Sequence, residues 1–398
     1  MKNHPLTLYL EINNFDYFFF VVEIDEQDNF KIIYKSEFRL RDTDNKKNLN
    51  LENVFNEIKR NVYLIEQKIE YTFNEIVLIL ENFSPTFINL TGYKQLNGSQ
   101  VLRENITYIL NTLKSYVYEV ENKKTVIHIF NSKFYLDNKK IDNLPIGLFG
   151  EFYSHELGFT LMDTNKYVRL KNIFELCNLK VKKILTKSFI EGANTSDNFK
   201  NIDTFFQIQI KENVSKIFYF ENDALKFEQS FKFGLNIIIK DISKITSLSM
   251  DNVQMILKRI DLNDKLSNDE LIEEKYFGED NFKAIKKKLV YEIALARIKE
   301  ISELLLFKNL NLSHYNNGSK AIFLEVNDKY QFKSINKIFE KVFTSKYDGD
   351  FKILDNLNSE NLLITANKLV HFGWKKEAIP IATSKKSFIA SIFETFFG

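Results

Sequence analysis

Three strands joined by short polar turns open the chain, and the same pattern returns in its second half. Aromatic and β-branched residues dominate each strand, which is typical of a β-meander. In the first half, a helix with apolar residues at helical spacing follows over Asn48–Glu70, and the short apolar run Glu75–Leu80 is typical of a central strand. The two sets of strands cover Leu6–Ile12, Asp16–Asp25 and Phe30–Leu40, and then Asp203–Ile210, Val214–Glu221 and Ala224–Phe233. The halves are not alike in sequence, but this order of elements predicts a duplicated α/β architecture.

A segment of different texture interrupts the first half between Asn82 and about Leu161. It is predicted to hold the strands Ser84–Thr91 and Thr125–Leu136, with the helix Gln100–Val117 between them, and therefore indicates an inserted α+β subdomain. The remaining predicted helices are Asn165–Cys177, Ile237–Ile245, Asp251–Leu257, Asn281–Lys308 and Ser334–Val342, and the remaining strands are Val181–Leu185 and Lys320–Glu325.

Composition excludes several classes of function. The formal net charge of the 398 residues is only +2, which argues against a protein built around a nucleic-acid-binding face. The single cysteine, Cys177, forms no internal disulfide and follows an apolar helical stripe, so we expect a small buried hydrophobe. The five histidines show no metal-ligand spacing. No apolar run is long enough to span a bilayer and no signal peptide is recognised, so we expect the protein in the cytosol or on its membrane face.

Glycine is scarce, and this limits the chemistry of the first half. The chain has 12 glycines, and the first of them is Gly92. Glycine allows backbone to approach a phosphate closely and to adopt positive φ. The first ninety residues therefore carry no ordinary glycine-rich phosphate loop.

Several stretches, taken in order, resemble the FtsA family of cell-division proteins, which have an actin-like ATPase fold and tether FtsZ filaments to the inner membrane. Each motif is weak alone, but their order and spacing cover nearly the whole chain. The stretches are IDNLPIGLFG at Ile141–Gly150, CNLKVKKIL at Cys177–Leu185, FKFGLNIIIKDIS at Phe231–Ser243, YEIALARIKEISELL at Tyr291–Leu305 and LITANKLVHFGWKK at Leu363–Lys376.

The resemblance implies a two-lobed, ribonuclease-H-like duplicated fold. In the family's terms, 1A comprises residues 1–81, 162–190 and 346–378, the inserted 1C-type subdomain 82–161, 2A residues 191–235 and 313–345, a helical 2B-type subdomain 236–312, and the linker with its membrane-targeting helix 379–398. It also implies FtsZ as a partner through the region around Ile237–Leu310, later division proteins through 82–161, and self-association into protofilaments. The expected location is the cytoplasmic face of the inner membrane at the division site.

The resemblance further implies an ATP–Mg²⁺ site, but its glycine-rich elements are absent. The first hairpin keeps an acid as Glu11 and has Asn13, which can take the left-handed conformation, where the family has glycine. The second hairpin has Gln209 in place of the acid, and Glu212 and Glu325 add negative charge near the phosphate positions. We therefore expect weak or no ATP binding and no hydrolysis. The positions assigned to nucleotide contact are Glu11, Asn13, Asn14, Gln209, Asn213, Arg297, Glu300 and Asn327, although Arg297 and Glu300 also fit an ordinary charge pair.

The end of the chain, Ser384–Gly398, has the pattern of an amphipathic helix that binds a membrane surface. Two lysines precede one apolar half of the helical wheel, which suits anionic lipid, and Pro380 separates this segment from the body. The predicted membrane-binding residues are Lys385, Lys386, Phe388, Ile389, Ile392, Phe393, Phe396 and Phe397. The alternative is a C-terminal helix that docks on the protein's own body.

Two other functions remain open at this stage. An ATP-binding enzyme of the sugar kinase, Hsp70 and actin superfamily requires intact Asp and Gly loops. A PilM-like assembly protein has a related fold and also binds partners, but should lack the amphipathic C-terminus.

Overall fold

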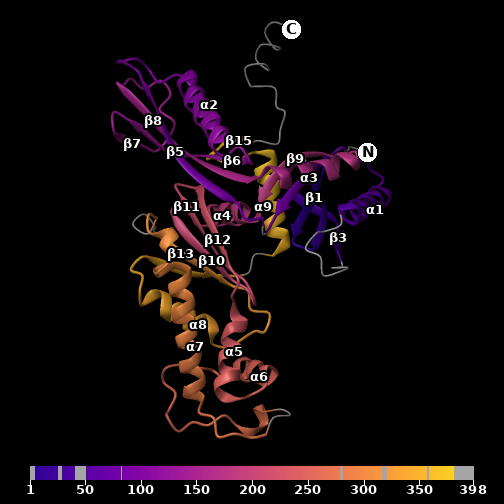
Figure 1. The fold of residues 1–398 in the computed structure, drawn as a ribbon, viewed down its shortest axis with the longest axis vertical. Coiled ribbons are helices and arrows are strands. Elements are labelled where there is room, and N and C mark those ends of the chain that lie inside the picture. Colours follow the sequence, from indigo (N-terminus) through magenta and orange to yellow (C-terminus); the bar gives the residue numbers. More distant parts are fainter. Residues whose placement is uncertain are drawn as a thin grey trace. The chain divides into compact units, whose positions relative to one another are not determined.

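The computed structural model describes residues 5–25, 29–40, 51–81, 83–277, 281–315, 321–355 and 358–380 (Figure 1). The chain forms two compact units, one of Met1–Asn198 with Asn358–Gly398, and one of Phe199–Leu357. We call these the first and second units. Within the described ranges, every helix is too short or too polar to cross a membrane.

The first unit is built on a five-stranded sheet in the order β3-β2-β1-β4-β9. Strands β1, β2 and β3 are antiparallel, whereas β4 and β9 run parallel to β1. Their bounds are β1 Leu6–Asn13, β2 Asp16–Ile24, β3 Phe30–Arg39, β4 Glu75–Leu80 and β9 Lys180–Thr186. Because β1 and β4 are central, both of their faces are buried, which accounts for their nearly continuous apolar sequences.

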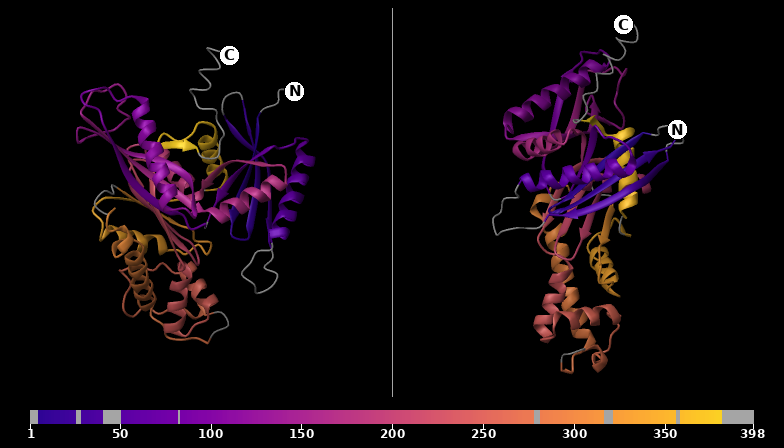
Figure 2. Two further views of the ribbon diagram at one scale, coloured as in Figure 1. Left: turned by 45° about the horizontal axis from the view of Figure 1, so that its top comes forward. Right: turned by 90° about the vertical axis from the view of Figure 1, so that its right-hand side faces the viewer.

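Helices cover both faces of this sheet. On one face, α1 (Leu51–Ile69) and α3 (Thr164–Leu176) join strand residues such as Leu8 in one hydrophobic core. On the other face lie α4 (Lys187–Asn198) and α9 (Ser359–His371, yellow in Figure 2), which pack together. Side chains alternate along a strand, so Tyr9 points away from Leu8 and donates its hydroxyl proton to Asn367 of α9.

The inserted segment and the late strand β15 together form a second sheet of the first unit. Its order is β15-β6-β8-β5, with β7 paired to β6. Its elements are β5 Thr86–Gln95, α2 Arg103–Val120, β6 Lys124–Leu136, β7 Lys139–Ile141, β8 Phe152–Asp163 and β15 Glu377–Pro380. The approach of α2 needs Gly92, because a Cβ at this position would lie 2.5 Å from Ile109. The strand β15 was not predicted: the linker was expected from 379, but the chain stays paired with β6 through Pro380. An edge strand of four residues tolerates proline and gives almost no periodic signal.

The second unit repeats the topology of the first sheet, with the order β12-β11-β10-β13-β14. The bounds are β10 Phe205–Ile210, β11 Ser215–Glu221, β12 Ala224–Phe231, β13 Ala321–Val326, β14 Asp350–Leu354, α5 Leu235–Thr246, α6 Met250–Arg259, α7 Lys287–Ser302 and α8 Ile335–Thr344. Three antiparallel strands are again followed by two parallel ones. The predicted duplication of architecture is therefore confirmed.

Three predicted boundaries differ from the structure. The second unit begins at Phe199 rather than at 191, because α4 continues to Asn198 with most of its residues buried in the first unit. It ends at Leu357 rather than at 345, because β14 pairs with β13. The long predicted helix Asn281–Lys308 is shorter: α7 starts at Lys287, after a bridge between Leu271 and Lys286, and ends in a π-helical turn over Glu303–Phe307.

Candidate functional site

Three neighbouring parallel strands of the first unit end in charged side chains that meet. Glu11 lies near the end of β1, Glu81 directly follows β4, and Lys187 directly follows β9. The register aligns these ends, with Ile12 opposite Leu80 and Leu80 opposite Thr186. Lys187 Nζ lies 2.7 Å from Glu11 Oε1 and 3.1 Å from Glu81 Oε2. The carboxyl edge of the sheet thus carries one ammonium between two carboxylates.

This cluster is largely shielded from water. The side chains of Glu11, Glu81 and Lys187 are 9%, 4% and 18% exposed. Burial disfavours the charged form of Lys187, but Glu81, Glu11 and Glu191 outweigh it and raise the pKa of Lys187 above its ordinary value. Glu11 was predicted as a site residue, whereas Lys187 and Glu81 were not. The signal in the sequence for these two was a charged residue immediately after a short apolar strand.

The hairpin that follows Glu11 keeps its turn without glycine. Asn13 is the last paired residue of β1, opposite Asp16, so the loop consists of Asn14 and Phe15. Asn14, and not Asn13, adopts the left-handed conformation, with φ of 55°. Asparagine tolerates this conformation better than most residues.

In the second unit, Gln209 and Glu325 bind each other. They face one another across the parallel pair β10–β13, and Gln209 Nε2 donates to Glu325 Oε2 at 2.9 Å. Both residues are buried. The Gln209 amide, at a position where the resemblance implies an acid, therefore binds a carboxylate of this chain.

The turn after β10 covers the start of α5 with backbone carbonyls. The N–H groups of Leu235 and Asn236 donate to Lys211 O and Glu212 O at 3.0 and 2.9 Å. A Cβ at Gly234 would lie 2.0 Å from Lys211 O, so only glycine permits this approach. Asn213, predicted as a site residue, accepts a hydrogen bond from the side-chain amide of Asn236 at 2.9 Å. Backbone N–H groups at an open helix N-terminus attract anions. In α5, the N–H groups of Leu235 and Asn236 already donate to backbone carbonyls.

The loop after β13 is closed by its own side chains. Asn327 donates its N–H to Ile210 O at 2.9 Å, which places it beside the end of β10. The carboxylate of Asp328 accepts the N–H groups of Tyr330 and Phe332, whose rings stack with centroids 5.2 Å apart. Burial raises the pKa of Asp328. A compact aromatic turn thus follows Asn327, one of the positions assigned to nucleotide contact.

Arg297 and Glu300 form a charge cluster within the helical part of the second unit. Arg297 of α7 binds Asp241 of α5 and lies 2.6 Å from Glu300 Oε2. The hydrogen bond to Asp241 raises the pKa of Arg297. This arrangement ties α5 to α7 through Asp241, a partner that the sequence analysis did not predict.

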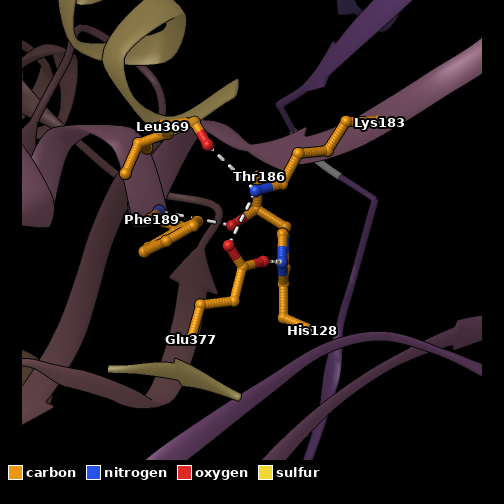
Figure 3. Close-up of polar contacts among 6 residues, drawn as sticks. All are labelled: His128, Lys183, Thr186, Phe189, Leu369 and Glu377. Atoms are coloured by element: carbon orange, nitrogen blue, oxygen red, sulfur yellow. Dashed lines mark hydrogen bonds and ion pairs between the residues drawn. The ribbon is translucent and has the colours of Figure 1, made fainter. Parts of the chain in front are cut away.

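A second buried polar cluster lies where β15 joins the first unit (Figure 3). Glu377 accepts from Lys183 Nζ at 2.7 Å and lies 3.0 Å from His128 Nδ1. Lys183 also donates to Leu369 O of α9 at 3.1 Å. The three charged or polar side chains are between 0% and 4% exposed. Although burial opposes it, the bond to His128 and the charge of Lys183 lower the pKa of Glu377. The cluster fixes β6, β9, α9 and β15 to one another.

The predicted membrane-binding residues, from Lys385 to Phe397, lie outside the described residues. In the described ranges, no group of His, Cys, Asp and Glu side chains is arranged to hold a metal ion. Cys177 is partly buried, and burial raises its pKa.

Comparisons with known proteins identify the fold. No protein-family profile and no curated protein matches the sequence. A solved PilM–PilN type IV pilus biogenesis complex aligns with a TM-score of 0.52 and 8% identity, over 94% of this chain and 99% of that chain. This chain has an actin-like ATPase fold. MreB5 of Spiroplasma citri bound to ADP aligns at a TM-score of 0.43 and 12% identity, over 92% and 96% of the two chains. The ethanolamine utilization protein EutJ from Carboxydothermus hydrogenoformans aligns at 0.41 and 7%, over 93% and 91%.

The predicted fold class is thereby confirmed. At these identities the likeness concerns the actin-like fold alone, so membership of the FtsA family stays a prediction. Three of the residues predicted to contact a nucleotide, Glu11, Gln209 and Asn213, are bound to side chains of their own unit.

An acid-sensitive histidine lies in the second sheet of the first unit. His155 of β8 is fully buried against the rings of Phe134 and Tyr153, and neither ring nitrogen has a hydrogen-bond partner among the described residues. Burial lowers its pKa to about 4. As the pH falls, His155 is therefore protonated in the unfolded chain before it is protonated in the folded protein. The free energy of unfolding should fall by about 3 kcal/mol between about pH 6.5 and pH 4.

Unfolding titrations between pH 7 and pH 4, followed by fluorescence of Trp374, measure this loss. His155→Phe keeps an aromatic ring in place and should remove a large part of the slope, whereas His314→Gln, at an exposed position, should leave it unchanged. A wild-type slope that survives in His155→Phe contradicts the assignment.

Proposed function

We propose that this chain is an adaptor that holds a cytoskeletal filament at a membrane surface, and that its actin-like body has stopped working as a nucleotide-dependent enzyme. The filament that the family resemblance favours is FtsZ. The observation that carries the proposal is the position of Lys187, whose ammonium binds both Glu11 and Glu81 at the carboxyl edge of the sheet.

Carboxylates at this edge bind a Mg²⁺–phosphate complex only if they are available to it. Glu11 and Glu81 are instead held by an internal cation. The second unit shows the same pattern. Glu325 is bound by Gln209, and the first backbone N–H groups of α5 are bound by backbone carbonyls of the same unit. A body that is complete without a ligand suits a scaffold better than an ATPase.

Nucleotide binding gives a direct measurement. Titration of the purified protein with ATP and Mg²⁺ in a calorimeter should show binding weaker than millimolar or no heat, because Glu11, Gln209 and Asn213 are already bound within the protein. An MreB protein measured in the same buffer serves as a positive control. Micromolar affinity for this chain contradicts the proposal that the body works without nucleotide.

Attachment to the membrane is assigned to the C-terminal segment. A short amphipathic helix with flanking lysines binds anionic lipid reversibly, and assembly on a filament adds avidity. Full-length protein should sediment with anionic vesicles, whereas a chain truncated after Ser384 should stay in the supernatant. The truncated chain must keep the unfolding midpoint of the full-length protein. Equal sedimentation of both chains contradicts this assignment.

Partner binding is tested with FtsZ polymers. The protein should co-sediment with them through the helical region 236–312, and the truncated chain should still do so because its body is intact. Recruitment of later division proteins through 82–161 and self-association are part of the same proposal. Failure to bind FtsZ, together with binding to a pilus-assembly partner, would favour the PilM-like alternative.

A further inference from the structure

A groove on the first unit lies at the C-terminal end of α9. Its cavity of about 480 Å³ has an apolar base, formed by Leu369 and Trp374, which are 2% and 9% exposed. Phe372, 64% exposed, stands at its rim, with its ring centroid 6.4 Å from that of Phe30. The other lining residues are Asp197, Thr365, Lys368, Gly373 and Lys375. An apolar base with aromatic walls and a few charges is typical of a binding pocket.

The groove is close to the point where the C-terminal segment leaves the body. Trp374 lines it, and β15 begins at Glu377. The same Lys183 ammonium binds both Glu377 and the carbonyl of Leu369, so the base of the groove and the start of β15 share one anchor. Residues 381–398 follow β15. Four residues lie between Pro380 and Lys385, and they span about 14 Å when extended.

The chemistry of this segment matches the groove. Its apolar half-wheel includes Phe388, Phe393 and Phe396, and aromatic side chains gain from edge and stacked contacts with Trp374 and Phe372. Charges are complementary as well: Lys385 and Lys386 suit Asp197, and Glu394 suits Lys368. Without lipid, these apolar side chains are left in water unless the protein covers them.

We propose that residues 385–398 dock in this groove when no membrane is present, and that lipid and groove compete for the same apolar face. This inference rests on the proposed membrane attachment and adds a switch to it. Because the segment is tethered beside the groove, its effective concentration there is in the millimolar range, so a weak contact suffices for occupancy. Membrane binding then requires release of the segment, which lowers the apparent affinity for lipid.

Trp374 reports on the groove directly, because it is the only tryptophan of the chain. In full-length protein without lipid, its fluorescence should be poorly quenched by acrylamide. Anionic vesicles should raise quenching to the level that the chain truncated after Ser384 shows without vesicles. The truncated chain itself should not respond to vesicles. Equal quenching of full-length and truncated protein in buffer overturns the inference.

Competition is measured with Phe372→Ala, which removes the exposed aromatic rim and leaves the base intact. It should bind anionic vesicles about two- to tenfold more tightly than wild type, which corresponds to the loss of one aromatic contact. Leu176→Ala, at a position 65% exposed on α3, is the matched control and should bind as wild type does. Unchanged vesicle affinity of Phe372→Ala overturns the inference.

Failure of the inference and failure of membrane attachment give different results. If the protein binds vesicles while Trp374 stays unchanged, attachment stands and docking in the groove is wrong. If the protein binds no vesicles, attachment is wrong, and the comparison of full-length with truncated protein still decides docking. A Trp374 signal that grows with protein concentration assigns the groove to the segment of a second copy and overturns docking within one chain.

Discussion

Replacing Glu377 with alanine is expected to lower the free energy of unfolding of the first unit by about 3–5 kcal/mol, which is the usual cost of removing one partner from a buried ion pair. The Lys183 ammonium, 4% exposed, would lose the carboxylate 2.7 Å away and, among the residues that the structure describes, keep only the carbonyl of Leu369. His128 would lose the partner of its Nδ1 atom. Since Glu377 is also the first residue of β15, the C-terminal segment would lose its fixed starting point. Urea unfolding followed by Trp374 fluorescence measures the change.

Two controls separate this effect from a general sensitivity of the first unit. Glu175→Ala breaks an exposed pair with Lys171 on α3 and should cost less than about 0.5 kcal/mol. The double variant Glu377→Leu with Lys183→Met removes both charges and should recover much of the loss, because apolar groups of similar size often replace a buried pair well. A loss below about 1 kcal/mol in Glu377→Ala, near the mean for point mutations, would show that water reaches this cluster.

The elements that the sequence predicts are those with many periodic apolar residues. The helical spacing of apolar residues in Asn48–Glu70 corresponds to α1. The two meanders correspond to β1–β3 and to β10–β12. By contrast, α4 was missed, because Gly192, Asn194 and Asp197 are poor helix formers, and their low propensity is overridden by the burial of most other residues of the helix. The four-residue β15 has no period to detect, and only its pairing with β6, far away in sequence, defines it.

The candidate site was predictable only as separate positions. Glu11 was chosen from the resemblance to the family's first hairpin, but its partner Lys187 is distant in the chain and comes near only when β1, β4 and β9 align. Asn213 and Asn327 were expected to face a ligand, yet each bonds to its own unit, because polar groups held against a sheet edge find the nearest partner. Sequence shows which residue types stand at strand ends, and strand register determines what they contact.

Replacing Lys187 with methionine is the second change from which we expect a large effect. Methionine keeps much of the apolar stem but removes the ammonium, so Glu11 and Glu81 would face each other with side chains only 9% and 4% exposed. We expect a loss of about 3–5 kcal/mol at pH 7, because buried charge is left without compensation. Trp374 fluorescence in urea again reports unfolding of the first unit.

The pH dependence of this loss distinguishes electrostatics from packing. Without Lys187, two buried carboxylates are left to repel each other, and protonation relieves this repulsion. The difference in stability between Lys187→Met and wild type should therefore shrink from pH 7 to pH 5. Lys187→Arg retains the charge and should show little of this pH dependence. A loss that is the same at both pH values would assign the role of Lys187 to packing and would remove the internal cation on which the proposed ligand-independent body rests.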